Sequence, residues 1–270
     1  MNKNRRAKNI WLLFVSGYLL LPLLLTVVYS FVGEWTSILP TGWTTQYYAD
    51  LFKDGKLLMG ALRGLAISVL PILISGSVVI LALYYALLYN PRVERIIQTL
   101  CMAPYTIQGI ILATSALSLY AGLPGPLGNR LVLLTCVYCI GILPFIYQGI
   151  RNGLRTVNLH QIIDAAQILG AGRLYAFVRL VLPSMISGVL ASGLLAMASI
   201  FGDYAIIRII AANHWPTAQF YLYNSRTLSI QTSSAIVMLL VIITMTISAS
   251  VLFLSGSRKS RRIPAEKESH

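Results

Sequence analysis

Few residues of this chain could do chemistry, and most of them stand alone. Asp203 is the clearest, because it is an acidic residue inside a long apolar stretch, near the end of Leu182–Ala205. An ionisable group at membrane depth is costly and marks a functional site, and a carboxylate there suits a cationic or amine-bearing solute. Cys136 and Cys139 form a C-x-x-C pair with no second pair near it, so we read them as small helix residues. The sequence contains no Ser/His/Asp set, HExxH or Walker-type motif, so we predict neither catalysis nor a metal site.

Three roles for Asp203 stay open at this stage. It could pair with Arg208, about one and a half turns later, contact a solute, or lie exposed at the outer edge of the membrane. Other candidates for a solute pathway are polar side chains next to Asp203 or just after the helix-breaking Pro104, where a kink would free backbone carbonyls. These candidates are Tyr204, Tyr105 and Gln108.

A second group of residues lies in a polar, arginine-bearing loop, 150–181, between strongly apolar stretches. In it, Asp164-Ala165-Ala166 is followed after three residues by Gly170, and after nine more by Leu180-Val181-Leu182-Pro183. Asn158 can cap a helix that begins near Leu159, and the glycine can end it. The apolar face of this helix is predicted from spacing to hold Ile162, Ala165, Ala166 and Leu169. Small residues permit close approach, so the helix could enter a groove on a partner; an ordinary interfacial helix is the alternative.

The composition places these residues in a membrane protein. The chain is 57% hydrophobic and 11% charged, with a mean hydropathy of +0.74, whereas soluble domains have about 25% charged residues. A helix needs about 20 apolar residues to cross a bilayer. Six stretches qualify: Ile10–Val32, Gly64–Leu88, Ile96–Tyr120, Leu131–Gly149, Leu182–Ala205 and Ser234–Leu254.

The distribution of charge gives an orientation. Of the 21 Lys and Arg residues, 15 lie before the first stretch, after the sixth, or in the loops that lie on the same side as these ends. The positive-inside rule makes that side cytoplasmic. We therefore predict a tail at 1–9, a transmembrane domain at 10–255 and a basic tail at 256–270, with both ends inside. Membrane insertion and anionic lipid explain the net charge of +13 without nucleic acid.

The loop resembles the signature of ABC importer inner-membrane permeases: Glu-Ala-Ala, three residues, Gly, nine residues, Ile-x-Leu-Pro. Asp164 replaces the glutamate and Leu180 replaces the isoleucine, while the spacing is kept. The stretch Trp35–Thr44 and the turn Met102–Pro104 resemble the branch that includes permeases for polyamines, 2-aminoethylphosphonate, ferric iron and thiamine. Polyamines and 2-aminoethylphosphonate fit best, because ferric iron and thiamine permeases are often double-length chains, whereas this chain is single-length.

The resemblance implies an all-α membrane protein of six transmembrane helices, with the type I ABC importer permease fold and a cytoplasmic coupling helix. It implies a multi-pass protein of the bacterial plasma (inner) membrane that forms half of a pore. Its partners would be a dimer of ABC ATPase subunits, a second permease subunit, identical or homologous, and an extracytoplasmic solute-binding protein. ATP and Mg²⁺ would be bound by the ATPase, with no cofactor on this chain. The residues that would couple to the ATPase are Asp164, Ala165, Ala166, Gly170, Leu182 and Pro183.

Two other classes of protein were weighed against this one. A six-span membrane enzyme or assembly factor would need a catalytic constellation, which the sequence lacks. A secondary transporter would usually carry internal repeats and more buried charge, and the sequence shows neither. The importer permease therefore remains the preferred prediction.

Overall fold

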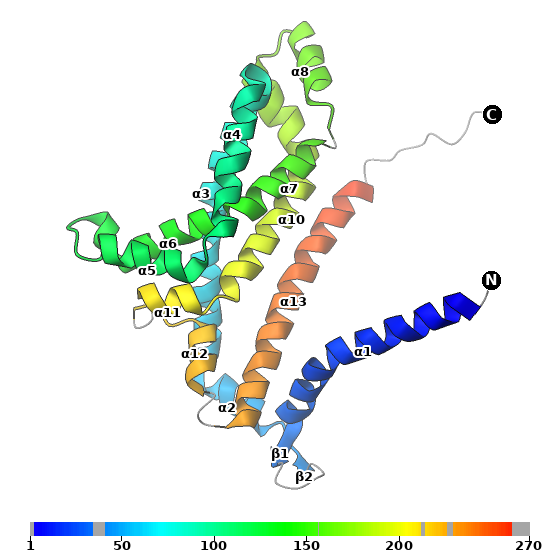
Figure 1. Cartoon of the computed structure of the whole chain (residues 1–270), viewed down its shortest axis with the longest axis vertical. Coiled ribbons are helices and arrows are strands. Elements are labelled where there is room, and N and C mark those ends of the chain that lie inside the picture. Colours follow the sequence, from blue (N-terminus) through cyan, green and yellow to red (C-terminus); the bar gives the residue numbers. More distant parts are fainter. Residues whose placement is uncertain (1–2, 35–40, 156, 212–213, 226–228, 261–270) are drawn as a thin grey trace.

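The computed structural model describes residues 3–34, 41–155, 157–211, 214–225 and 229–260, most of them helical (Figure 1). The elements in chain order are α1 (Lys3–Phe31), β1 (Val32–Glu34), β2 (Thr41–Trp43), α2 (Gln46–Asp54), α3 (Lys56–Tyr89), α4 (Pro91–Met102), η1 (Ala103–Thr106), α5 (Gly109–Tyr120), η2 (Pro126–Gly128), α6 (Arg130–Gly141), α7 (Leu143–Arg155), α8 (Leu159–Ile168), α9 (Arg173–Ala176), η3 (Phe177–Val181), α10 (Leu182–Phe201), α11 (Ala205–Ala211), α12 (Ala218–Ser225) and α13 (Ile230–Ser260).

The helices account for the six predicted stretches. Within the described residues, α1, α3 and α13 each contain a stretch long and apolar enough to cross a membrane. Three more spans arise if each pair of helices that meets at a bend is taken as one. These pairs are Pro91–Thr106 with Gly109–Tyr120, Arg130–Gly141 with Leu143–Arg155, and Arg173–Ile186 with Gly188–Phe201. The prediction of a helical, six-span membrane protein is confirmed.

The third predicted span, Ile96–Tyr120, is divided into two helices by a sharp bend. α4 ends at Met102, the tight turn η1 follows, and the chain is extended at Gln108 before α5 begins. Pro104 has no backbone N–H and cannot continue the helical ladder, so the predicted kink is present. The two pieces meet at 95°, and α5 and α6 therefore project sideways from the other helices, next to α11 (Figure 1).

A short hairpin departs from the all-helical prediction. β1 and β2 pair antiparallel, with Val32 opposite Trp43. The Tyr48 hydroxyl donates to Ser30 Oγ at 2.8 Å and fixes α2 against the end of α1. α2 is short because Gly55, in a left-handed conformation, ends it, and α3 begins at once. Residues 35–40 of the Trp35–Thr44 stretch lie outside the described residues.

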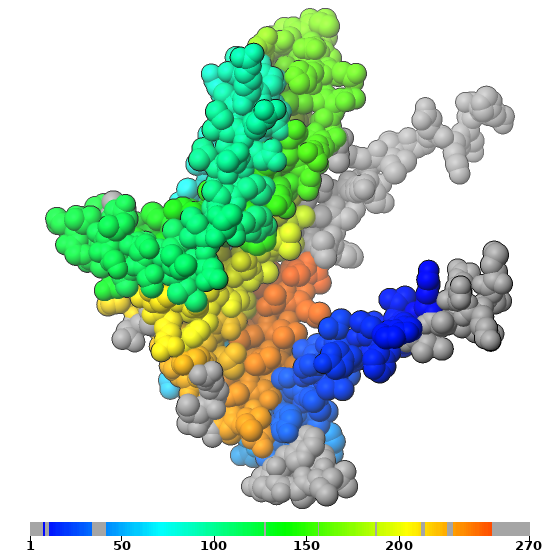
Figure 2. Space-filling view, viewed as in Figure 1, coloured from blue at the N-terminus to red at the C-terminus, as the bar shows by residue number. Residues whose placement is uncertain are grey.

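The core joins α3, α6, α7, η3 and α10. It includes the buried side chains Leu83, Leu134, Ile150, Val181 and Ile200. α1, in contrast, packs on α13 near the hairpin and then leaves the other helices (Figure 2). Within this chain, residues 11–25 of α1 are exposed, while 26–31 are partly or fully buried.

Small residues let α7 and α10 approach closely. Gly149 and Gly153 of α7 face Gly188 and Ser192 of α10, and a Cβ added at Gly188 would lie 3.0 Å from the Gly153 Cα. Small residues four apart are a common way to pack membrane helices, because the backbones come into van der Waals contact. This contact fixes α7, which leads into α8, against α10, which follows α8 in the chain.

Gly149→Ala should therefore destabilise the protein, because the new Cβ would overlap the Ser192 side chain. Overpacking of this kind costs about 1–3 kcal/mol, which should appear as a lower unfolding temperature of the detergent-solubilised protein. Gly141→Ala is the matched control, since no heavy atom lies within 4 Å of a Cβ built there. Equal unfolding temperatures for the two variants would contradict the close packing.

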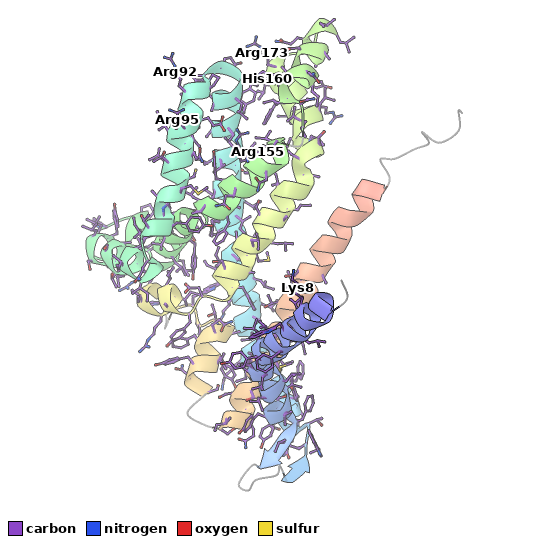
Figure 3. The ribbon with its side chains drawn as sticks, turned by 45° about the vertical axis from the view of Figure 1, so that its right-hand side comes forward. Lys8, Arg92, Arg95, Arg155, His160 and Arg173 are labelled. Atoms are coloured by element: carbon purple, nitrogen blue, oxygen red, sulfur yellow. The ribbon has the colours of Figure 1, made fainter. Side chains whose placement is uncertain are left out.

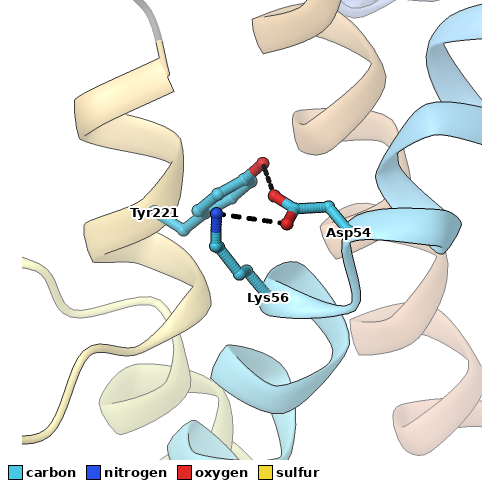
Figure 4. A network of polar contacts seen from close by, with 3 residues as sticks. All are labelled: Asp54, Lys56 and Tyr221. Carbon is cyan, nitrogen blue, oxygen red and sulfur yellow. Dashed lines mark hydrogen bonds and ion pairs between the residues drawn. The ribbon is translucent and has the colours of Figure 1, made fainter.

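The opposite end of the molecule from α8 is held by polar contacts. Asp54 at the end of α2 accepts a hydrogen bond from the Tyr221 hydroxyl at 3.2 Å and forms an ion pair with Lys56 at 3.1 Å (Figure 4). Burial and the Asp54 carboxylate raise the pKa of Tyr221 above its ordinary value, so the hydroxyl stays protonated and donates. In addition, the Trp215 indole N–H donates to the Arg63 carbonyl at 3.2 Å. α12 is thereby attached to α2 and to the first turns of α3.

Tyr221→Phe should loosen this attachment only slightly. The contact is partly exposed to solvent, so its loss should cost less than about 1 kcal/mol. We expect a small fall in unfolding temperature, with Tyr18→Phe, a change at an exposed position of α1, as the control. A fall as large as that of Gly149→Ala would mean that α12 depends on this bond more than its exposure indicates.

Candidate functional site

α8 forms the tip of the molecule, beyond the ends of α3 and α4 (Figure 1). It begins at Leu159 as predicted, but the Asn158 side chain makes no capping hydrogen bond. It ends before Gly170, which has φ +83°, a left-handed conformation that glycine adopts without strain. The Ala171 N–H donates back to the Ala166 carbonyl at 2.9 Å and closes the helix end. The predicted role of Gly170 as the residue that ends this helix is confirmed.

The apolar residues predicted to share one face of α8 are divided between its buried and its exposed surface. Leu159, Ile163 and Ala166 are buried, with Ala166 only 5% exposed. Ala165 and Leu169, predicted on the same face as Ala166, are exposed. The assignment was wrong because apolar residues occur all around this short helix, so their spacing alone does not select the face that packs.

The outward surface of α8 includes Asp164, Ala165 and two large apolar side chains, together with the polar His160, Gln161 and Gln167. Ile168 and Leu169 are each 87% exposed, the highest fractions among the exposed large apolar side chains of the described residues. Ala166 belongs to the inward surface and holds α8 on the rest of the chain. Of the predicted docking triplet, only Asp164 and Ala165 face outward.

The chain stays helical through Pro183. The π-turn η3 widens the helix by one residue per turn, and the Leu182 N–H donates to the Phe177 carbonyl. Pro183 then occupies the first turn of α10, where its missing N–H is tolerated. Leu182 packs against the core and Pro183 is exposed. The two residues thus join the loop to α10 without a gap.

Basic side chains surround this end of the molecule. Figure 3 shows Arg92, Arg95, His160 and Arg173 close to the tip and Arg155 just below it. Glu94 of α4 forms an ion pair with Arg151 of α7 at 2.5 Å. A cavity of about 490 Å³, lined by Arg151, Arg155 and His160 among others, lies between the end of α7 and the start of α8. This end has a strong positive charge.

Asp203 lies just after α10, which ends at Phe201, rather than inside the predicted span Leu182–Ala205. Its Oδ2 accepts a hydrogen bond from the Tyr138 hydroxyl at 2.8 Å, and its Oδ1 accepts one from the Ala205 N–H at 3.1 Å. Asp203 thus caps α11 and ties it to α6.

Of the three roles left open for Asp203, pairing with Arg208 is not the one that the structure shows. Arg208 instead donates to the Tyr223 hydroxyl at 3.3 Å, and its guanidinium lies 5.0 Å from the centroid of that ring. The Tyr204 ring stacks on Tyr223, with centroids 4.4 Å apart. Arg208 and Asp203 therefore have separate partners.

A cavity of about 400 Å³ lies beside the Asp203 carboxylate. The residues around it come from the break before α5, from α6 and from α10 and α11, and they include Pro104, Gly109, Tyr138, Ser199, Asp203 and Ile206. Most of the lining residues are apolar, and the polar side chains among them are the carboxylate of Asp203, the phenol of Tyr138 and the hydroxyl of Ser199. Such a cavity suits a small solute that carries a positive group.

Of the predicted pathway residues, Asp203 alone lines this cavity. Tyr105 is exposed and packs edge-on against Phe145, with ring centroids 6.0 Å apart. Gln108 is exposed and Tyr204 belongs to the stack on Tyr223. Tyr138 was missed by the sequence reasoning, because one tyrosine within an apolar stretch carries no signal of its own.

Comparisons with known proteins agree with this geometry. The family described as "Binding-protein-dependent transport system inner membrane component" matches residues 78–259, a range that contains the Asp164–Pro183 loop. The spermidine/putrescine transport system permease protein PotC of Escherichia coli (strain K12) is 25% identical over 215 residues, which cover 78% of each chain. The putrescine transport system permease protein PotI of the same organism is 22% identical over 221 residues, covering 79% of this chain and 78% of its own.

Solved structures share the fold. A structure of the MetNI methionine ABC transporter in an inward-facing conformation aligns with a TM-score of 0.61 at 18% identity, over 76% of this chain and 97% of its own. A bacterial ABC transporter involved in the import of the acidic polysaccharide alginate aligns with a TM-score of 0.66 at 15% identity, over 98% of this chain and 100% of its own.

Proposed function

Because the chain belongs to the family of binding-protein-dependent transport system inner membrane components, it is a transport component and not an enzyme, and we propose that it forms half of the translocation pore of an ATP-driven ABC importer. The family match over 78–259 carries this proposal. The exposed helix α8, which contains the loop signature, is the local feature that fits it.

The partner docked on α8 is an ATPase subunit that binds ATP and Mg²⁺. Asp164, Ala165, Ile168 and Leu169 provide the contact surface, and Gly170 sets the angle at which α8 stands. Positive charge at the same end supports a cytoplasmic position for α8. A second permease subunit completes the pore, and a solute-binding protein docks at the opposite end, where α2 and α12 lie.

The imported solute carries an amine. Two observations support this: the cavity beside Asp203 presents a carboxylate to its contents, and the relatives PotC and PotI are named for polyamines. Spermidine, putrescine and 2-aminoethylphosphonate all have an ammonium group at neutral pH. Ferric iron and thiamine are the alternative solutes of the same branch.

Reconstitution tests the proposal. The chain is co-expressed with a candidate ATPase, second permease and binding protein, purified as a complex and placed in proteoliposomes. We expect the ATPase to co-purify, and ATP inside the vesicles to drive transport of one of the five labelled solutes. A purified chain that carries no ATPase, or solute movement driven by an ion gradient alone, would favour a secondary transporter.

A further inference from the structure

Four side chains connect the segment after α8 to the inner end of α3, and we call them the aromatic clamp: Tyr84, Tyr89, Arg173 and Phe177. The Tyr84 ring meets the Phe177 ring edge-on, with centroids 4.9 Å apart. Tyr89, the last residue of α3, lies edge-on to Tyr84 at 6.1 Å. The Arg173 guanidinium lies 5.7 Å from the centroid of the Tyr89 ring.

The position of the clamp links it to α8 on one side. Arg173 starts α9, three residues after Gly170. Phe177 is the first residue of η3 and is 2% exposed. It lies in the same apolar core as Ile163 and Ala166 of the buried face of α8. A displacement of α8 is therefore transmitted to Phe177 through close-packed side chains.

On the other side the clamp acts on α3, which is one helix over its 34 residues. Edge-on aromatic pairs and a cation over a ring have preferred geometries, so Phe177 cannot slide past Tyr84 freely. The π-turn η3 adds a local means of movement, because its hydrogen bonds can shift register to those of an α-helix, and π-turns occur often at functional sites.

We infer that Tyr84, Tyr89 and Arg173 are positioning residues that carry a displacement of α8, imposed by the ATPase, to α3, which packs on α6 and α10, two of the helices around the cavity beside Asp203. This inference rests on the proposed docking of α8. It adds a defined route from the docking helix to α3, through residues that do not line that cavity.

The test uses the reconstituted complex and measures solute transported per ATP hydrolysed. In Tyr84→Leu we expect the ATPase to co-purify and to hydrolyse ATP, while transport per ATP falls about fivefold or more, the size of a lost coupling interaction. Tyr84→Phe should restore coupling, because the edge-on contact needs the ring and not the hydroxyl. Phe31→Leu is the control, since it removes a ring paired with Tyr48 at 5.2 Å in a different part of the molecule.

Each outcome bears on one claim. Transport per ATP at the wild-type value in Tyr84→Leu overturns the inference, as does equal loss in Tyr84→Leu and Phe31→Leu. If the complex with Tyr84→Leu does not assemble, Arg173→Gln is used instead, because Arg173 is exposed and its change leaves the core intact. In that variant, a loss of about twofold in transport per ATP supports the clamp, and no loss overturns it. A wild-type chain that retains no ATPase defeats the proposed function instead, before any variant is compared.

Discussion

Leu169→Asp should release the ATPase from the complex. Leu169 is 87% exposed on α8 and has no role in the core, so the change leaves the fold intact. Burial of such a side chain against a partner contributes about 1.5–3 kcal/mol, and a charge in its place must also be desolvated. We expect docking to weaken about 10- to 100-fold or more, measured as the ATPase retained on the purified permease.

A matched variant separates this effect from general damage. Leu123→Asp places the same charge at an exposed leucine in the loop after α5, away from α8, and should retain the ATPase fully. Ala166→Arg would be a poor test, because Ala166 is buried and an arginine there would detach α8 from the core. Full ATPase retention by Leu169→Asp would show that the partner docks elsewhere.

Asp203→Asn should abolish most of the uptake of an amine-bearing solute while the complex and its ATP hydrolysis remain. The amide keeps the shape of the side chain and an oxygen that can accept from the Ala205 N–H, so α11 stays capped. What disappears is the negative charge beside the cavity of about 400 Å³. A hydrogen bond to a charged group contributes about 1.5–3 kcal/mol, so uptake should fall about 10- to 100-fold.

Two further variants test whether the charge of Asp203 is the cause of the lost uptake. Asp50→Asn neutralises an exposed carboxylate on α2 and should leave uptake unchanged. Tyr138→Phe removes the 2.8 Å hydrogen bond to Asp203 but keeps its charge, so it should reduce uptake less than Asp203→Asn. Normal uptake in Asp203→Asn would assign the residue to capping of α11 alone and would remove the physical argument for an amine.

The membrane spans and the position of α8 were predictable because they depend on local properties. Apolar length identifies the spans, and Gly170 adopts a left-handed conformation with little strain. Pro104 marks a candidate break because it lacks a backbone N–H, although Pro22 and Pro71 lie inside α1 and α3. The 95° angle at Pro104 was not predictable, because it depends on how α5 packs on α6 and α11.

The contacts that shape the candidate sites could not be predicted from the sequence, because they depend on the tertiary fold. Tyr138 and Asp203 are 65 residues apart in the chain, and only the fold brings them together. The buried face of α8 likewise depends on its packing next to η3, and a ten-residue helix with apolar residues on all sides gives no preferred direction. Arg208 was the nearer partner for Asp203 in sequence, but two tyrosine rings hold it elsewhere.

α3 reaches from one face of the protein to the other without interruption. At about 1.5 Å per residue, its 34 residues extend well past a hydrocarbon layer of about 30 Å. Its first residues take part in the network of Asp54 and Tyr221, and its last residue lies under Arg173. Thermodynamic linkage then applies: if ATP binding changes the affinity for an extracytoplasmic partner by some factor, that partner changes the affinity for ATP by the same factor. The dissociation constant of the outer partner would therefore report the nucleotide state of the motor on the opposite side of the membrane.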